Sequence, residues 1–289
     1  MNIQEKKLML QGKILTELNR NKKSLDIQDY EFGVFSQWGE DGIIQFLIEK
    51  IKIKNKIFVE FGVENYQESN TRFLLQNDNW SGLVIDGSED NINFIKSGDL
   101  YWRHSLTAIS DFITKENINK IITDNGISGD IGILSVDIDG NDYWVLKNIE
   151  CVNPVILIVE YNSLFGNNLS ITVPYDESFD RMKKHFSGLY WGASISALTK
   201  LAKEKGYNLV GSNSAGVNLF FVKDEFIGDL KVLMPQDAYI ESKFRQSRDD
   251  SGNLTYLDNK TGLELIKDMS VYNILDNKEY KIKDLNNAQ

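Results

Sequence analysis

The sequence predicts an α/β protein built on a doubly wound sheet that is mostly parallel and ends in an antiparallel hairpin. Short apolar runs alternate with helical segments between residues 57 and 205, which is the pattern of parallel strands joined by crossover helices. The run Val155–Val159 is apolar at every position and is typical of a central strand covered on both faces. Two later runs, 207–210 and 218–222, flank a turn rich in Gly, Ser and Asn, which indicates the hairpin.

The first half of the chain supplies helices and the opening strands. We expect a helix over residues 1–25 that packs on the protein or forms an interface, and another that starts near Ser36. The apolar stripe of the first helix is Leu8, Leu10, Ile14, Leu15 and Leu18. The strands that we expect here cover residues 57–59, 83–85 and 105–110, with helices over 69–77 and 88–96 between them.

The second half continues the alternation. The helices that we expect cover residues 111–125, 144–149 and 194–205, with strands over 132–136 and 155–159. Residues 230–289 are more polar, and we interpret them as an appendage, either a small β-structure or an oligomer contact.

Composition excludes several classes of protein. The net charge of −10 over 289 residues disfavours nucleic acid and anionic membranes as partners, because binding to phosphate needs clustered Lys and Arg. Cys151 is the only cysteine, so no internal disulfide can form, and we expect a cytoplasmic protein. The longest strongly apolar run is too short to span a bilayer, so no membrane span is expected.

Residues 56–87 indicate a nucleoside site. They have the pattern strand, turn, helix, strand, and in a parallel βαβ unit the turn after the first strand lies beside the end of the second. Gly62 lets the backbone approach a ligand, and Asp86 can accept hydrogen bonds from both hydroxyls of a ribose. The alternative is a crossover whose carboxylates are merely solvated.

The turn after the first strand suits a cation better than a phosphate. A dinucleotide fold requires Gly-x-Gly-x-x-Gly here, but the turn has one glycine, and Glu64 stands where the second would be. No phosphate-binding P-loop motif is present either. S-adenosylmethionine (SAM) carries an amine, a sulfonium and a ribose but no phosphate, so Glu60 and Asp86 both suit it.

Further carboxylates follow the fourth and fifth strands. Asp137, Asp139 and Asp142 come after residue 136, and Glu160 and Asn162 follow residue 159. Side chains at the carboxyl ends of parallel strands converge on one crevice, so we expect Asp139, Glu160 and Asn162 to be able to bind Mg²⁺. Asp137 or Asp139 can instead take a proton from a hydroxyl. The alternative for Asp137 and Asp142 is a structural role in capping the next helix.

Histidine and basic residues offer weaker signals. One cysteine and two distant histidines disfavour zinc. His185 is a candidate general base, or else a solvated histidine. Arg181, Lys183 and Lys184 form a basic cluster that can hold a substrate diphosphate, or else a solvated face.

Seven segments together resemble the FkbM-like branch of class I SAM-dependent methyltransferases, over roughly residues 35–225. The matching segments are Phe35-Ser-Gln-Trp-Gly-Glu-Asp-Gly, Phe58-Val-Glu-Phe-Gly, Ser69-Asn-Thr-Arg, Gly82-Leu-Val-Ile-Asp, Leu134-Ser-Val-Asp-Ile-Asp-Gly-Asn-Asp-Tyr-Trp, Val159-Glu-Tyr-Asn and Asn218-Leu-Phe-Phe-Val. The resemblance implies a Rossmann-like sheet of seven strands whose last strand is antiparallel. Asp86 departs from the pattern, because glutamate is common there.

The resemblance also implies how the cofactor is held. It places SAM on the turn 60–62, the ribose at Asp86, and the adenine near residues 108–111. Many relatives look like O-methyltransferases of sugars or natural products. The cofactor-binding residues that we expect are Gln37, Glu60, Gly62, Asn70, Thr71, Asp86, Ser110 and Asp137.

We therefore hypothesise a SAM-dependent O-methyltransferase acting on a sugar hydroxyl of a nucleotide-linked sugar or surface-glycan precursor, with or without Mg²⁺. Residues 1–34 would be a helical segment, 35–229 the methyltransferase domain and 230–289 the appendage, in a chain that can form a homo-oligomer. The expected catalytic residues are Asp137, Asp139 and His185. Two rivals stay open: an NAD-dependent nucleotide-sugar oxidoreductase, and a glycan-assembly partner that keeps the fold without turnover.

Overall fold

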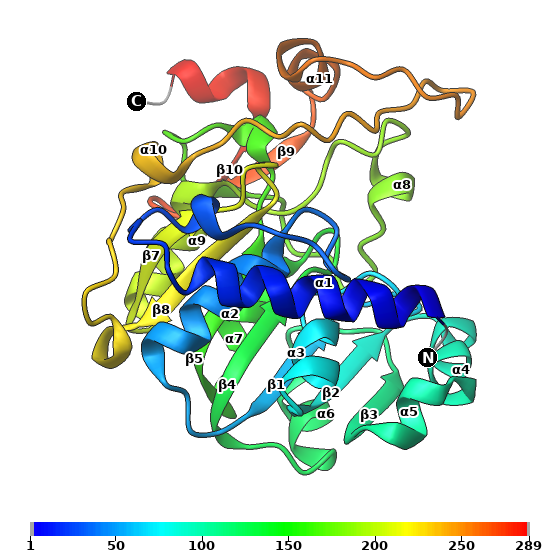
Figure 1. Cartoon of the computed structure of the whole chain (residues 1–289). Coiled ribbons are helices and arrows are strands. Elements are labelled where there is room, and N and C mark those ends of the chain that lie inside the picture. Colours follow the sequence, from blue (N-terminus) through cyan, green and yellow to red (C-terminus); the bar gives the residue numbers. More distant parts are fainter. Residues whose placement is uncertain (1–2, 288–289) are drawn as a thin grey trace.

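The computed structural model describes residues 3–287 and contains a seven-stranded sheet with helices on both faces (Figure 1). The strand order is β3-β2-β1-β4-β5-β8-β7. The bounds are β1 Ile57–Phe61, β2 Ser81–Asp86, β3 Leu106–Ser110, β4 Gly129–Val136, β5 Val152–Glu160, β7 Tyr207–Ser212 and β8 Asn218–Lys223.

The predicted fold class is confirmed. The strands β1 to β5 pair in parallel, whereas β8 is antiparallel to both β5 and β7. The reversed strand therefore lies one position inside the sheet, and β7 forms the edge. As a result, the residues that precede β8 reach the same edge as the carboxyl ends of β1, β2, β4 and β5.

The helices cover the sheet in two layers. One face carries α2, α3 and α4 with the short helix η1, and the other carries α6, α7 and α9. The bounds are α1 Ile3–Asn19, η1 Ile27–Tyr30, α2 Glu40–Ile51, α3 Arg72–Asn77, α4 Glu89–Ser97, α5 Asp99–Arg103, α6 Ile118–Asp124, α7 Asp142–Asn148, η2 Ser163–Phe165, α8 Arg181–Lys184, α9 Ile195–Glu204, η3 Asp224–Phe226, α10 Pro235–Ala238, α11 Asn259–Leu265 and η4 Ile282–Asn287. Within residues 3–287, no helix is both long enough and apolar enough to cross a membrane.

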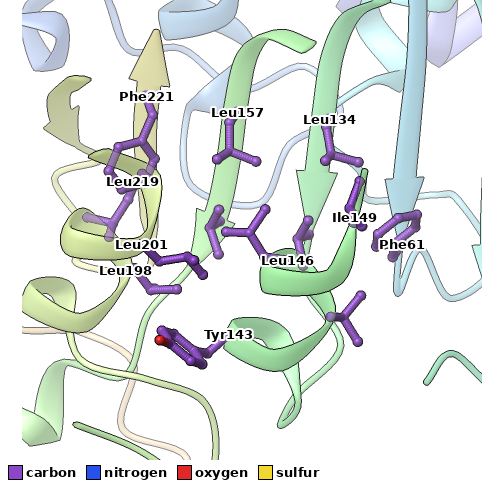
Figure 2. Close-up of a cluster of buried hydrophobic side chains, with 14 of the residues drawn as sticks. Phe61, Leu134, Tyr143, Leu146, Ile149, Leu157, Leu198, Leu201, Leu219 and Phe221 are labelled. Atoms are coloured by element: carbon purple, nitrogen blue, oxygen red, sulfur yellow. The ribbon is translucent and has the colours of Figure 1, made fainter. Parts of the chain in front are cut away.

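Strand β5 is the centre of the core, as its apolar run predicts. Leu157 and Val159 face the layer of α7 and α9, whereas Ile156 and Ile158 face the layer of α2. Figure 2 shows the first of these layers, in which strand residues such as Leu157 lie above Leu146 of α7 and Leu198 of α9. Because β5 is buried on both faces, the strands on either side of it are held in a fixed register.

Helix α1 packs through a different face from the one that its apolar stripe indicates. Met9, Gly12 and Thr16 are its buried residues, and a Cβ on Gly12 would lie 2.5 Å from a methyl of Val34 and 2.8 Å from the Phe73 ring. The stripe residues are 36% to 60% exposed. Small residues let α1 approach the protein closely, so its larger apolar residues are left on the outside.

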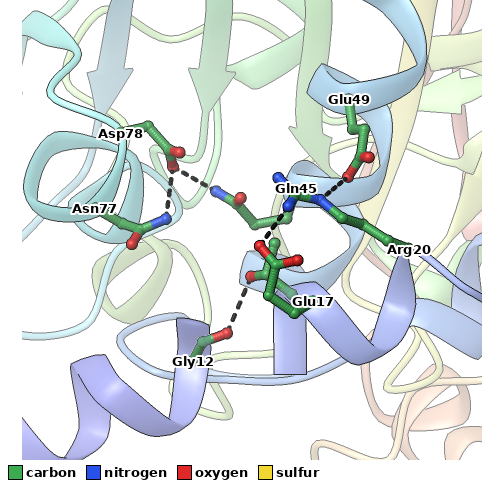
Figure 3. Close-up of polar contacts among 8 residues, drawn as sticks. Gly12, Glu17, Arg20, Gln45, Glu49, Asn77 and Asp78 are labelled. Atoms are coloured by element: carbon green, nitrogen blue, oxygen red, sulfur yellow. Dashed lines mark hydrogen bonds and ion pairs between the residues drawn. The ribbon is translucent and has the colours of Figure 1, made fainter. Parts of the chain in front are cut away.

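Polar contacts fasten the end of α1 to its neighbours (Figure 3). Arg20 pairs with Glu17 of its own helix and, at 3.1 Å, with Glu49 of α2. Gln45 of α2 in turn donates to Asp78, the residue that follows α3, at 2.6 Å. Helices α1, α2 and α3 are thus linked as one layer.

The helix predicted over residues 111–125 is shorter than expected. The sequence predicts a largely helical segment there, but α6 begins only at Ile118. Thr114 and Asn117 exchange hydrogen bonds, with the Thr114 N–H donating to Asn117 Oδ1 at 2.8 Å and the Asn117 N–H donating to Thr114 Oγ1 at 3.2 Å. This reciprocal turn starts the helix late and leaves residues 111–113 as a loop.

The C-terminal residues form a second, three-stranded sheet. Its order is β10-β9-β6, with β6 Ile171–Thr172, β9 Ser270–Asn273 and β10 Lys278–Lys281. In Figure 1 the orange-to-red segment that includes α11 runs across the upper part of the view, above the seven-stranded sheet. Strand β6 comes from the loop after β5, so the C-terminal segment is built onto the loops at the carboxyl edge of that sheet.

Gly62 is the residue that allows β1 and β4 to end side by side. Its φ is +68°, and a Cβ there would lie 1.7 Å from the Asp137 carbonyl oxygen. The sequence predicted a close approach of this glycine to a ligand, but the close contact is with the protein backbone. The turn after β1 is thereby held against the turn after β4.

Gly62→Ala should lower the free energy of unfolding by more than about 3 kcal/mol, because both the φ and the backbone contact oppose a side chain. Gly126→Ala is the matched control, since its φ is +79° but nothing lies within 4 Å of the added Cβ. It should cost only about 1 kcal/mol. Equal losses in urea unfolding for the two variants would contradict the role of the Asp137 contact.

Candidate active site

A cavity of about 790 Å³ lies at the carboxyl edge of the sheet. The ends of β1, β2, β4 and β5 and the residues before β8 line it, together with loops and part of the C-terminal segment. This is where open α/β sheets bind ligands. The predicted site residues in its wall are Gln37, Glu60, Gly62, Asn70, Asp86, Asp137, Asp139, Glu160 and Asn162.

Glu60 is a buried carboxylate that holds the loop before α3. Its Oε2 accepts hydrogen bonds from the Ser69 hydroxyl at 2.8 Å, the Thr71 N–H at 3.1 Å and the Thr71 hydroxyl. Its Oε1 accepts the Asn70 N–H at 2.8 Å. Burial raises the pKa of Glu60, and these hydrogen bonds act against the rise. The single bond to Oε1 leaves that oxygen able to accept another from a ligand.

Asp86 connects the turns that follow β1 and β2. Its Oδ2 accepts the Glu64 N–H at 2.8 Å, and its Oδ1 accepts the Ser88 N–H at 2.9 Å and the Asn91 amide at 3.0 Å. Glu64 has φ +46°, a conformation that is uncommon for a residue with a side chain. Asp86 thus fixes a strained turn, and one lone pair of Oδ2 remains for a ligand hydroxyl.

The loop after β3 supplies the next part of the wall. Asp111, Phe112 and Ile113 line the cavity, and the Asp111 N–H donates to the Asp86 carbonyl at 3.1 Å. The Phe112 side chain is 53% exposed and lies beside Gly87, 3.8 Å from where a Cβ would be. An exposed aromatic ring at a cavity wall offers a stacking surface. Sequence analysis missed Phe112 because it placed this loop in a helix.

The loop of residues 33–39 depends on a buried carboxylate that sequence analysis did not select. Asp41 Oδ2 accepts the N–H groups of residues 34–36 at 2.7–2.9 Å. The Ser36 hydroxyl accepts the Asp41 N–H at 2.9 Å in return. Burial raises the pKa of Asp41 to about 6, although these N–H groups act to lower it. The loop carries Gln37 and Trp38, which both line the cavity.

Three carboxylates gather at the ends of β4 and β5. One oxygen each of Asp137, Asp139 and Glu160 lies within 4.8 Å of the others. Burial, together with the neighbouring negative charges, raises the pKa values of Asp137 and Glu160 well above the usual carboxyl range. The hydrogen bond between these two lowers the pKa of Asp137 and raises that of Glu160. The two carboxyl groups are therefore arranged to hold a proton between them.

Asp139 is exposed and balanced by a cation. It has φ +55° and forms an ion pair with Arg181, whose guanidinium lies 5.9 Å from the centre of the Trp191 ring. Among the described residues, Glu160 Oε2 has no hydrogen-bond partner although it is buried. A buried oxygen of this kind requires a proton or a cation, so Asp137, Asp139 and Glu160 are the residues that could hold a divalent ion.

Four predicted site residues have other roles. Asn162 caps η2 by accepting the Leu164 N–H at 3.1 Å, and its amide donates to two carbonyls, so its side chain has a structural role and one lone pair of its oxygen is already used. Thr71 is fully buried against Glu60, and Ser110 ends β3 with its side chain outward. In the described chain, neither these two nor His185 lines the cavity.

His185 closes a turn instead of facing the cavity. Its Nδ1 lies 2.8 Å from the Ser187 hydroxyl, and its ring stacks on Phe186. Lys183 and Lys184 pair with Asp180 and Asp176. Of the predicted basic cluster, only Arg181 lies in the cavity wall, because a single turn of helix, α8, points its residues in different directions.

The C-terminal segment completes the cavity. We call residues 240–258 the strap. Two backbone hydrogen bonds attach it to the rest of the protein. The Ser242 N–H donates to Ser163 Oγ at 3.0 Å, and the Arg248 N–H donates to the Ser187 carbonyl at 3.2 Å. The strap residues in the cavity wall are Ser242, Phe244, Arg245, Gln246, Arg248, Leu257 and Asp258.

The backbone is similar to that of many solved structures. The N-terminal domain of EvdMO1, solved with S-adenosylhomocysteine (SAH) bound, is 11% identical with a TM-score of 0.42, over 72% of this chain and 95% of that one. An O-methyltransferase from Bacillus cereus in complex with SAH is 12% identical with a TM-score of 0.39, over 75% and 91%. A SAM-dependent methyltransferase from Clostridium acetobutylicum is 10% identical with a TM-score of 0.41, over 73% and 96%.

No protein-family model and no curated protein sequence matches the chain. The identities and TM-scores of the solved structures are too low to transfer an activity. The function therefore has to be argued from the residues of the site.

Removing the Asp41 carboxyl should change how stability depends on pH. The pKa of Asp41 is about 6 in the folded protein and 3.8 is its ordinary value, so the folded state binds the proton more tightly. Proton binding by Asp41 therefore adds to the free energy of unfolding below pH 3.8, and this added stability is lost as the pH rises through 6. Between pH 4 and 7 the free energy of unfolding of the wild type should fall by about 2 kcal/mol relative to that of Asp41→Asn.

Urea unfolding at both pH values measures this difference. Asp90→Asn, on the exposed side of α4, is the control and should leave the pH dependence unchanged. Parallel pH profiles for wild type and Asp41→Asn would show that the folded protein does not raise the pKa of Asp41.

Proposed function

We propose that this protein is a SAM-dependent methyltransferase that acts on a sugar hydroxyl. The observation that carries the proposal is the charge of the cavity wall at the ends of β1, β2 and β3. The charged side chains of the described wall there are all carboxylates, namely Glu60, Glu64, Glu68, Asp86 and Asp111. A cationic ligand with hydroxyl groups is stabilised by this wall, and SAM is such a ligand.

The same wall disfavours a dinucleotide. The N–H of Glu64, at the position of the missing second glycine, is used by Asp86, and the Glu64 side chain lines the cavity. A pyrophosphate there would face several carboxylates with no cation to balance it. This argues against the NAD-dependent oxidoreductase.

The residues of this wall would hold SAM by three contacts. Asp86 would accept hydrogen bonds from the ribose hydroxyls, the Phe112 ring would stack on the adenine, and Glu60 Oε1 would accept one from the amine. Bound SAM supplies a methyl group on a sulfonium that is open to in-line attack. Gln37, Gly62, Asn70 and Asp137 stay proposed cofactor contacts because they line the same cavity.

Asp137 is the residue that we propose takes the proton of the attacking hydroxyl. In this proposal Glu160 keeps the proton that the pair holds, and Arg181 neutralises Asp139 beside Asp137. A Mg²⁺ ion held by Asp137, Asp139 and Glu160 would lower the pKa of a bound hydroxyl. Asp139 would then exchange its partner, Arg181, for the ion.

The outer part of the cavity supports a sugar acceptor. Trp38, Trp191 and Phe244 line it together with the amides of Gln246 and Asn259. Aromatic rings with nearby hydrogen-bonding groups suit a sugar, which has apolar faces and hydroxyl edges. A nucleotide-linked sugar or a surface-glycan precursor, membership of the FkbM-like branch, a cytoplasmic location and a homo-oligomer all stay predictions.

Calorimetric titration tests the cofactor first. SAM or SAH should bind with micromolar affinity, and NAD should not bind. Asp86→Ala should weaken SAM binding by about 10- to 100-fold, since it removes a charge-assisted contact to the ribose. Asp90→Ala, which lies outside the cavity, should leave SAM affinity unchanged.

Two outcomes of this titration would count against the proposal. NAD binding without SAM binding would favour the oxidoreductase. SAM binding without SAH release on any sugar precursor would favour the non-catalytic assembly partner.

Substitutions in the carboxylate cluster separate a proton-sharing pair from a metal site. Asp137→Asn should lower kcat by about 10²- to 10⁴-fold because the base is lost, and should weaken SAM binding far less than it lowers kcat. Glu160→Gln should keep more than a tenth of the activity, since the amide still donates to Asp137 as the protonated Glu160 does. EDTA should then have no effect on the rate.

A metal site gives a different pattern in the same measurements. Asp137→Asn and Glu160→Gln would both be inactive, EDTA would abolish turnover, and Mg²⁺ would restore it. Calorimetric titration of Mg²⁺ into the wild type and into Glu160→Gln would then show binding only to the wild type.

A further inference from the structure

The positive charges of the cavity wall come from one residue type. Among residues 3–287, three of the chain's six arginines line the cavity, whereas none of its 26 lysines does. They are Arg181, Arg245 and Arg248. Arginine is favoured over lysine where a planar guanidinium makes two parallel hydrogen bonds to a phosphate or carboxylate. An acidic protein that selects arginine here has a site for an oxyanion.

Within residues 3–287, two of these arginines form no ion pair, although the charge of Arg245 is close enough to Asp258 to lower the pKa of that carboxyl. In the described part of the chain, neither Arg245 nor Arg248 forms an ion pair, and each guanidinium donates to a backbone carbonyl of the strap, of Tyr256 and Gly252 respectively. Each group has five N–H donors, so most of them remain for a ligand. The backbone carbonyls orient the guanidinium groups without neutralising them.

The strap also places Arg248 near Arg181. The Arg248 N–H donates to the Ser187 carbonyl, and Arg181 lies against the next residue, with its Nε 3.8 Å from the Cβ position of Gly188. Arg181 leads on to Asp139 and the carboxylate cluster. Arg181 therefore lies between the strap, which carries Arg248, and the proposed site of methyl transfer.

A second hollow of about 390 Å³ adjoins the cavity on the side of Arg245. The two share Trp38, Phe244, Arg245 and Gln246 in their walls, and the second adds Lys243, Leu254 and Tyr256. Tyr256 is 54% exposed, and the rings of Trp38 and Phe244 meet edge to face with centroids 6.2 Å apart. Aromatic rings around a small hollow give a planar base a surface for stacking.

We propose that the acceptor is a sugar linked to a nucleoside diphosphate, with its base in the second hollow and its phosphates on Arg245 and Arg248. The sugar then extends past Arg181 toward Asp137. The proposal rests on the methyltransferase function proposed above and names its substrate class. The order aromatic hollow, arginines, carboxylate cluster matches the order base, diphosphate, sugar along such a molecule.

Calorimetric titration of UDP, GDP, CDP, ADP and dTDP, without SAM, tests the proposal. At least one should bind at micromolar concentration and at least 10-fold more tightly than inorganic pyrophosphate. Arg245→Gln and Arg248→Gln should each weaken this binding by about 10- to 100-fold and leave SAM affinity unchanged. Lys260→Gln, which removes a charge next to the strap but lines neither hollow, should change neither affinity.

Tyr256→Ala tests the base separately from the phosphates. Its exposed side chain can be removed without opening the core, and it should weaken nucleotide binding about 10-fold but leave pyrophosphate binding unchanged. SAM affinity of each variant shows whether it has folded.

Three results would overturn the inference. They are the absence of nucleotide binding in a protein that binds SAM, equal affinity for pyrophosphate and nucleotides, and binding of glucuronate in place of any nucleotide. None of these bears on the methyltransferase proposal, which instead fails when SAM does not bind.

Discussion

Negative charge concentrated at one edge of the sheet is the constraint on which the site depends. Within residues 3–287, the cavity wall contains eleven carboxylates and three arginines. Buried carboxylates are tolerated only where hydrogen bonds, protons or cations balance them. Each solution is present: Glu60 and Asp86 accept backbone N–H groups, burial raises the pKa values of Asp137 and Glu160 so that the pair can hold a proton, and Arg181 pairs with Asp139. The region left without balance is the one to which we assign a cationic ligand.

The hydrogen bonds that balance these carboxylates also shape the loops. Glu60 holds the loop before α3, Asp86 holds the turns after β1 and β2, and Asp41 holds the loop of Trp38. Removing one of these carboxylates would therefore move a segment of the cavity wall as well as a charge. Binding and stability are coupled at this edge because the same side chains serve both.

The sheet could be predicted from sequence because its signals are local. The apolar run of β5 indicates that this strand is buried on both faces, and the turn before β8 indicates a hairpin. Glu60, Asp86 and Asp137 could also be placed, since the end of a parallel strand fixes where its next side chain lies. The local roles of Asn162 and His185 could not be predicted, because polar residues in the loops that follow strands can also close turns. The face through which helix α1 packs could not be predicted, because Gly12 and Thr16, which are not strongly apolar, belong to it.

The strap had no sequence signal because backbone hydrogen bonds attach it. The Arg248 N–H and the Ser187 carbonyl would be present with almost any residues at those positions, so the pairing leaves no pattern in composition or periodicity. Arg245 and Arg248 also lie far along the chain from Asp137, Asp139 and Glu160. Only the folded chain brings them to the same cavity.

The position of the strap late in the chain has a consequence for synthesis. A growing chain that has emerged from the ribosome to about residue 230 already contains all seven strands of the main sheet and the carboxylates at its edge. The strap and its arginines follow only afterwards. Because domains fold as their chain emerges, the wall that contacts the cofactor can form while the opposite wall is still inside the exit tunnel. The part of the site that would select the acceptor is therefore the last to be made.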